Sequence, residues 1–73
     1  MNGTRKTSRQ PDAEFNNHGS IISLLPLTEA AQAWIDDYVE TEEWQWFGGA
    51  LCGEPRMMHD ICEAMQRDGL ICV

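Results

Sequence analysis

The sequence predicts a small α/β domain in which a three-stranded sheet is combined with two helices in the order β-α-β-α-β. Three observations lead to this prediction: three short runs of strand-forming residues, two intervening stretches with apolar residues at helical spacing, and a length of 73 residues, which suits one domain. Residues 1–19 hold only Met1 and Phe15 as large apolar side chains. This composition predicts a disordered, flexible tail, followed by a single domain over residues 20–73.

The first strand and the first helix follow directly after the tail. Residues 20–25 form a β-branched and aliphatic run that Pro26 closes, which predicts a strand. Thr28 is a favourable helix N-cap, and a helix is expected over about residues 29–40. Its apolar face is predicted from the i, i+3, i+4, i+7 spacing of Ala31, Trp34, Ile35 and Tyr38.

Residues 44–52 predict the middle strand because they are rich in aromatic and aliphatic residues. Within this strand, Gly48 and Gly49 indicate a bulge or a close approach of another backbone. The aromatic cluster of this strand is expected to belong mainly to the core, with one side chain available to a partner: Trp44, Trp46 and Phe47.

The second helix is expected to begin at Glu54-Pro55, since proline suits the first helical position. Gly69 is expected to end it in the left-handed conformation, so that Leu70 folds back on Met65. Residues 70–73 then form the last strand. The apolar stripe of this helix is predicted to consist of Met58, Ile61, Cys62 and Met65.

The strand order is left open by the sequence. Parallel strands with right-handed crossovers would place the helices on one face or on both, and an antiparallel or mixed sheet is also compatible with three short strands. A sheet face left bare would be apolar. Such a face would be expected to pair with a second copy of the chain or with a partner.

The net charge is −7, with 12 acidic and five basic residues. This charge disfavours direct binding of nucleic acid, which depends on Lys and Arg, and it disfavours anionic membranes. No run of about 18 apolar residues is present, and the first residues lack the apolar stretch of a secretory signal. We therefore expect a soluble cytoplasmic protein that binds neither nucleic acid nor membrane.

Acidic residues are concentrated where basic residues are missing. No Lys or Arg occurs between Gln10 and Pro55, and acids near the C-terminus of the first helix oppose its dipole. Two interpretations are open: a solvated surface that keeps the protein soluble, or a surface that engages a basic partner, for example by imitating nucleic-acid charge. Of the acids, Glu29, Asp36 and Glu40 are expected on one outer stripe of the helix. The candidate partner-binding residues are Glu29, Asp36, Asp37, Glu40, Glu42, Glu43 and Trp44.

Catalysis, a metal and a cofactor are not expected. The exposed carboxylates lack a pocket that would raise a pKa, and no glycine-rich phosphate loop is present. A zinc site or a cysteine nucleophile with His59 is the alternative to ordinary packing of the thiols. No C-x-x-C pair exists, so reduced and mostly buried thiols are predicted instead. The residues concerned are Cys52, His59, Cys62 and Cys72.

Three motifs resemble a family of small uncharacterised proteins encoded by bacteriophages, prophages and plasmids. They are Trp46-Phe47-Gly48-Gly49-Ala50-Leu51, Glu54-Pro55-Arg56 and Asp68-Gly69-Leu70. The resemblance covers about residues 20–73 and includes the leucine-rich strand and the helix with Trp34. It implies no activity and no site residues. It implies a context, because accessory genes of mobile elements often encode small inhibitors of host machinery, including anti-CRISPR and anti-restriction proteins.

Three functions follow as hypotheses from different classes. The first is an acidic accessory protein that binds and modulates or inhibits a host protein, which is itself basic or handles nucleic acid. The second is a homo-oligomeric structural module, with a homodimer formed by a bare sheet face. The third is a metal-binding protein that uses His59 and the cysteines.

Overall fold

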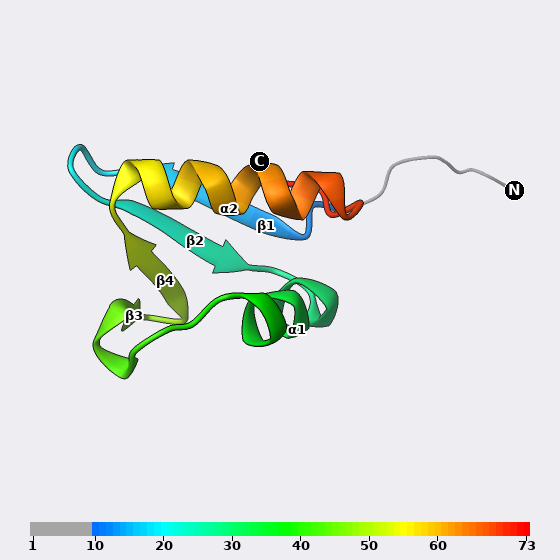
Figure 1. The fold of residues 1–73 in the computed structure, drawn as a ribbon, viewed down its shortest axis with the longest axis horizontal. Helices are drawn as coiled ribbons and strands as arrows, with labels where there is room; N and C mark the ends of the chain where they lie inside the picture. The colour runs from blue at the N-terminus through cyan, green and yellow to red at the C-terminus, as the bar shows by residue number, and fades with distance from the viewer. Residues whose placement is uncertain (1–9) are drawn as a thin grey trace, which may run out of the picture.

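The computed structural model describes residues 10–73 and confirms an α/β domain with two α-helices (Figure 1). The sheet has four strands rather than three, in the order β1-β2-β4-β3, and every pair of neighbouring strands is antiparallel. Of the arrangements that the sequence left open, β1 to β4 therefore adopt the antiparallel one. The elements are β1 (Ala13–Asn17), β2 (Ile22–Pro26), α1 (Glu29–Tyr38), the 3-10 helix η2 (Glu43–Gln45), β3 (Trp46–Phe47), β4 (Ala50–Gly53) and α2 (Pro55–Arg67).

The additional strand, β1, lies in the stretch that composition assigned to a flexible tail. The prediction of disorder for residues 1–19 is wrong for β1, which pairs with β2 over its whole length. Ala13 is fully buried, because a small side chain at this strand position fits beneath the helices. The turn between the strands is closed by the Gly19 N–H, which donates a 2.8 Å hydrogen bond to Asn17 Oδ1. Residues 1–9 of the predicted tail lie outside the described residues.

The expected single strand over residues 44–52 is instead a short 3-10 helix followed by a β-hairpin. Gly48 and Gly49 have φ angles of 56° and 85°, and they form the two-residue turn between β3 and β4. Two consecutive positive φ angles are the requirement of the hairpin turn whose twist matches that of the strands, and glycine meets it without steric cost. The glycines therefore mark a reversal of the chain, not a bulge.

The last segment follows α2 as expected but forms only a single bridge. Gly69, with φ of 92°, turns the chain at the end of α2. The N–H of Leu70 then donates to Met65 O at 3.0 Å, which confirms the predicted fold-back. Residues 70–73 run parallel to β1 through the Ala13–Cys72 bridge. They extend the sheet beyond β1 without forming a regular strand.

Both helices cover the same face of the sheet. Leu24 and Leu51 are paired across β2 and β4, point to the same side and are fully buried. Residues of α1 and α2 complete this cluster, and Figure 1 shows both helices beside β2. The core consists of Ala13, Ile22, Leu24, Ala31, Ile35, Leu51, Met58, Ile61 and Met65. The opposite face carries half-buried Leu25 and Ala50, and neither helix covers it.

The buried carboxylate of Asp12 joins three segments and is only 6% exposed. Its Oδ1 accepts a 2.9 Å hydrogen bond from the Thr28 hydroxyl, while its Oδ2 accepts a 2.8 Å bond from the N–H of Ile71. The Thr28 hydroxyl in turn accepts from the N–H of Ala31, which confirms Thr28 as the N-cap of α1. Asp12 thereby ties the start of β1 to α1 and to the C-terminal segment.

Candidate functional site

Five of the predicted acidic residues lie together on an exposed segment between α1 and β3. Asp36 and Asp37 are in the last turn of α1, which contains no basic residue. Carboxylates at this end of a helix are opposed by its dipole, so each costs about 0.3–1 kcal/mol when exposed. We call this region the acidic segment; it comprises Asp36, Asp37, Glu40, Glu42 and Glu43, all of which are exposed.

Glu29 does not belong to the acidic segment. It lies in the first turn of α1, where a carboxylate is favoured by the helix dipole. The helix ends at Tyr38, because Val39 has extended φ and ψ angles of −120° and 123°. The predicted outer stripe of Glu29, Asp36 and Glu40 is therefore wrong for Glu40, which follows the helix. Glu29 and Asp36 are both exposed and lie seven residues apart on one face of α1, as predicted.

The aromatic residues around η2 are more exposed than the prediction of a core cluster requires. Trp44 is 72% exposed and Phe47 is 63% exposed. Only Trp46 packs against the core, and its indole N–H donates a 3.1 Å hydrogen bond to the Thr41 hydroxyl. The exposed Trp44 immediately follows the acidic segment in the chain, so the structure brings a large apolar side chain to its end.

An apolar pocket of about 560 Å³ lies beside Trp44, and we call it the hairpin pocket. Its apolar walls are formed by Ile21, Trp44, Phe47 and Met57. Glu54 also lines it, but this carboxylate is engaged as the N-cap of α2 and accepts a 2.7 Å bond from the N–H of Met57. The hairpin pocket can therefore receive an apolar side chain at the end of the acidic segment.

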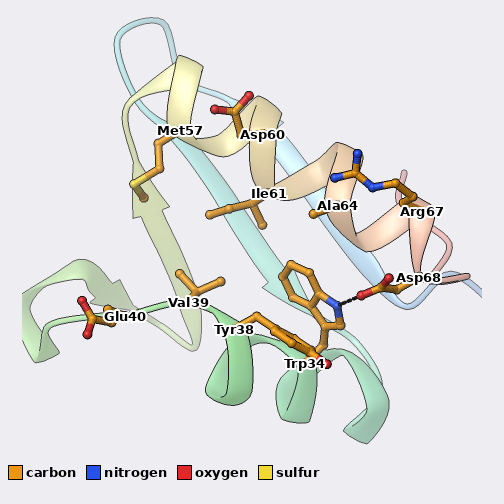
Figure 2. A pocket seen from close by; sticks show the side chains of 10 residues that line it. All are labelled: Trp34, Tyr38, Val39, Glu40, Met57, Asp60, Ile61, Ala64, Arg67 and Asp68. Atoms are coloured by element: carbon orange, nitrogen blue, oxygen red, sulfur yellow. Dashed lines mark hydrogen bonds between the residues drawn. The ribbon is translucent and has the colours of Figure 1, made fainter.

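A second hollow, of about 520 Å³, lies between the two helices and is shown in Figure 2. We call it the α1–α2 groove. Trp34 and Tyr38 form one wall, with ring centroids 5.2 Å apart and planes at 46°. The helical spacing predicts that Tyr38 packs in the core, yet it is 70% exposed and its ring lies against Trp34 instead. Met57 lines both the α1–α2 groove and the hairpin pocket.

Of the charged residues of the α1–α2 groove, only Glu40 is among the site residues predicted from the sequence. Glu40, Asp60 and Asp68 contribute carboxylates, and Arg67 is its one cation among the described residues. Asp68 is fixed by a 2.7 Å hydrogen bond that the Trp34 indole donates to its Oδ2. These residues are 34 positions apart in the chain, so only the packing of α1 against α2 brings them together.

The residues weighed as metal ligands do not form a metal site in the described part of the chain. Over residues 10–73, no group of three or more His, Cys, Asp or Glu side chains is arranged to hold a metal ion. The three cysteines are free, as predicted, but they are half-buried rather than buried. His59 is exposed on α2.

Cys72 is the cysteine with the most clearly perturbed environment. Burial is the main cause that raises the pKa of its thiol from 9.0 to about 11, and the neighbouring Cys62 thiol and the Asp12 carboxylate raise it further. The thiolate is the reactive form of cysteine. Cys72 is therefore a protonated, weakly nucleophilic thiol at neutral pH.

The raised pKa of Cys72 predicts a loss of stability at alkaline pH. Below pH 9 the thiol is protonated in both the folded and the unfolded chain, whereas between pH 9 and about 11 the unfolded chain releases the proton first. The free energy of unfolding is therefore expected to fall as the pH rises through this range. Urea unfolding measured across it checks this, with Cys72→Ala as the control. Equal slopes for the two proteins would contradict the assignment.

The helices of the described region are not built to span a bilayer. Within residues 10–73, none combines the length and the apolar character that crossing a membrane requires.

Comparison with known proteins gives no relative from which a function could be transferred. No protein-family model matches the chain, and no curated protein or solved structure matches it significantly. The resemblance to proteins of mobile elements therefore stays a prediction.

Proposed function

We propose that this protein is a small acidic accessory protein of a mobile genetic element that binds and modulates or inhibits a basic host protein. The partner is a nucleic-acid-handling protein of the cytoplasm, as in anti-CRISPR or anti-restriction inhibition, and the acidic segment imitates nucleic-acid charge. The resemblance of three sequence motifs supports the mobile-element context. The surface chemistry supports the class of partner.

The observation that carries the proposal is the exposed Trp44 at the end of the acidic segment. Exposed acids alone are typical of any soluble protein, and exposed apolar residues alone are common on surfaces. Here an apolar side chain that is 72% exposed borders an apolar pocket and five carboxylates. Tryptophan is enriched at the centres of protein interfaces, while complementary charge steers association.

The charge distribution favours a different protein over a second copy as the partner. All 12 acidic residues of the chain lie between Asp12 and Asp68, where Arg56 and Arg67 are the only basic residues. Two such surfaces repel each other, whereas a basic surface is attracted. The uncovered sheet face, with Leu25 and Ala50, is the feature that supports the alternative of a homo-oligomeric module.

Charge reversal at the end of α1 tests the proposal. We expect Asp36→Lys/Asp37→Lys to weaken binding of the captured host partner about tenfold, because both residues are exposed and lack a neighbouring cation in their helical turn. The measurement is affinity capture from host lysate at about 0.05 M and about 0.5 M NaCl, followed by titration of the purified partner. The matched control is Glu14→Lys/Glu63→Lys, which changes the net charge equally on other elements.

The outcomes separate the candidate functions. A basic partner that is lost in the Asp36→Lys/Asp37→Lys protein and at high salt, but kept by the control, supports the proposal. If both variants lost partner binding equally, the effect would come from net charge alone, which would contradict a defined acidic site. Recovery of the protein alone, unchanged by salt or charge reversal, would contradict a host partner and favour self-assembly.

A further inference from the structure

The α1–α2 groove has an apolar floor that is open at the surface. Val39, Ile61 and Ala64 contribute to this floor between the two helices (Figure 2). Its volume of about 520 Å³ is in the range of pockets that accept a small ligand or a few side chains. A purely polar ligand would leave the floor unused.

The aromatic wall of the groove is held in place by the fold. The Trp34 indole is tied to Asp68 on the opposite helix, and the Tyr38 ring packs beside it at 5.2 Å. A guanidinium group stacks favourably on such aromatic faces, through its planar shape and its charge. The wall therefore suits an arginine better than the compact ammonium group of a lysine.

The carboxylates of the groove complement a cation. Glu40, Asp60 and Asp68 come from the segment after α1, from the middle of α2 and from the C-cap of α2. In Figure 2 the Arg67 side chain is directed away from the Asp68 carboxylate. The bond from the indole occupies Asp68 Oδ2, which leaves Oδ1 in position to accept from a guanidinium.

Other occupants fit these features less well. A wholly apolar ligand would remove water from three carboxylates without replacing their hydrogen bonds, which is unfavourable. A small cation would not use the apolar floor or the aromatic wall. A second copy of the chain is repelled by the excess of negative charge over residues 10–73. An arginine offers both an apolar stem and a charged planar end.

We infer that the α1–α2 groove binds a basic peptide segment of the partner protein and takes up one arginine together with an adjacent apolar side chain. The arginine stem lies on Ile61 and Ala64, its guanidinium stacks on the aromatic wall, and Asp68 accepts its hydrogen bonds. The apolar neighbour fills the remainder of the groove toward Met57. This inference rests on the proposed function, because it names the chemistry by which the partner is recognised.

The indole N–H signals of the three tryptophans in ¹⁵N NMR spectra of the full chain show where a peptide binds, because each tryptophan lies at a different place. Trp34 lies in the α1–α2 groove, Trp44 lies in the hairpin pocket, and Trp46 packs against the core. The probe is a capped synthetic amphipathic peptide that places an arginine beside a leucine in each helical turn. We expect its titration to shift the Trp34 indole signal most, and we expect the lysine version to bind about fivefold more weakly.

Two pairs of variants locate the site. Ala64→Met fills the groove, while Ala33→Met makes the same change at an exposed position of α1 outside it. Asp68→Asn removes the charge but keeps an oxygen that accepts from Trp34, and Glu63→Gln is its control at an exposed position of α2 outside both the groove and the acidic segment. We expect the groove variants to lower the affinity for the arginine peptide about tenfold and the controls to change it less than about twofold.

Each unfavourable result identifies what fails. A shift confined to Trp44 would overturn the groove as the peptide site and leave the acidic segment as the site of a basic partner. Equal affinities for the arginine and lysine peptides, with no effect of Ala64→Met or Asp68→Asn, would also overturn the inference. Absence of any peptide binding would overturn it too, while the capture experiment with Asp36→Lys/Asp37→Lys judges the proposed function separately.

Discussion

Replacement of Asp12 by alanine is expected to lower the free energy of unfolding by about 3 kcal/mol. The Asp12 carboxylate accepts hydrogen bonds from the Thr28 hydroxyl and from the Ile71 N–H, at 2.9 and 2.8 Å. Because Asp12 is only 6% exposed, water cannot readily take its place. The substitution therefore leaves the Ile71 N–H without its carboxylate partner in a half-buried position.

The expected loss is large for a chain of this size. Domains of this length have free energies of unfolding of only about 4–11 kcal/mol, so the substitution removes a substantial fraction. Its effect extends to the N-cap of α1, because the Thr28 hydroxyl that donates to Asp12 also accepts from the Ala31 N–H. Loss of Asp12 frees the orientation of this hydroxyl.

Urea unfolding followed by circular dichroism measures the effect of Asp12→Ala. The control is Glu63→Ala, which removes an exposed carboxylate from the interior of α2 and is expected to change the free energy of unfolding by less than about 0.5 kcal/mol. A change for Asp12→Ala as small as that of the control would show that the junction of the three segments does not stabilise the fold.

Local sequence signals predict the helix ends correctly, because the physical causes of these ends lie within a few residues. Thr28 caps α1 as predicted, since its side chain accepts from a backbone N–H group of the first turn. The second helix begins at Pro55 as predicted, and the Glu54 side chain caps it. Gly69 ends α2 in a left-handed conformation, as predicted. Each of these helix ends depends on interactions within four or five residues, so it can be predicted without the tertiary structure.

The β-structure was predicted less well because it depends on pairing between distant residues. The strand β1 has the composition of a tail, with Phe15 as its one large apolar residue, and it becomes a strand only when β2 lies beside it. Within a single strand, Gly48 and Gly49 predict a bulge or a close backbone approach, although two consecutive glycines between strand-forming residues are also a hairpin signal. The choice between the two was settled by the pairing of β3 with β4.

The same distinction between local and long-range features applies to the candidate site. Exposure of the acidic segment follows from its charge and was expected, and so was an aromatic side chain available to a partner. The α1–α2 groove was not predicted, because Trp34 and Asp68 meet only through the packing of the two helices. Tyr38 has the spacing of a core residue, but Ile35 and Val39 fill the core at this end of α1, and the Tyr38 ring lies against Trp34 and is exposed.

Removal of residues 10–19 is expected to abolish cooperative folding. A chain that begins at Ser20 lacks β1, which pairs with β2 from Ala13↔Pro26 to Asn17↔Ile22, and it lacks the fully buried Ala13 side chain. It also lacks the partner of the C-terminal segment, whose Val73 N–H donates to Ala13 O at 3.0 Å. Both sides of the missing strand would expose unpaired backbone groups and part of the core.

Comparison of chains that begin at Gln10 and at Ser20 isolates the contribution of these ten residues. The longer chain keeps the pairing of β1 with β2 and with residues 70–73, so we expect it to show a sigmoidal thermal transition and dispersed amide signals in ¹⁵N NMR spectra. The shorter chain is expected to show neither. If residues 10–19 were a flexible tail, as composition alone predicts, the two chains would unfold with the same free energy, because an unpacked tail contributes no buried surface.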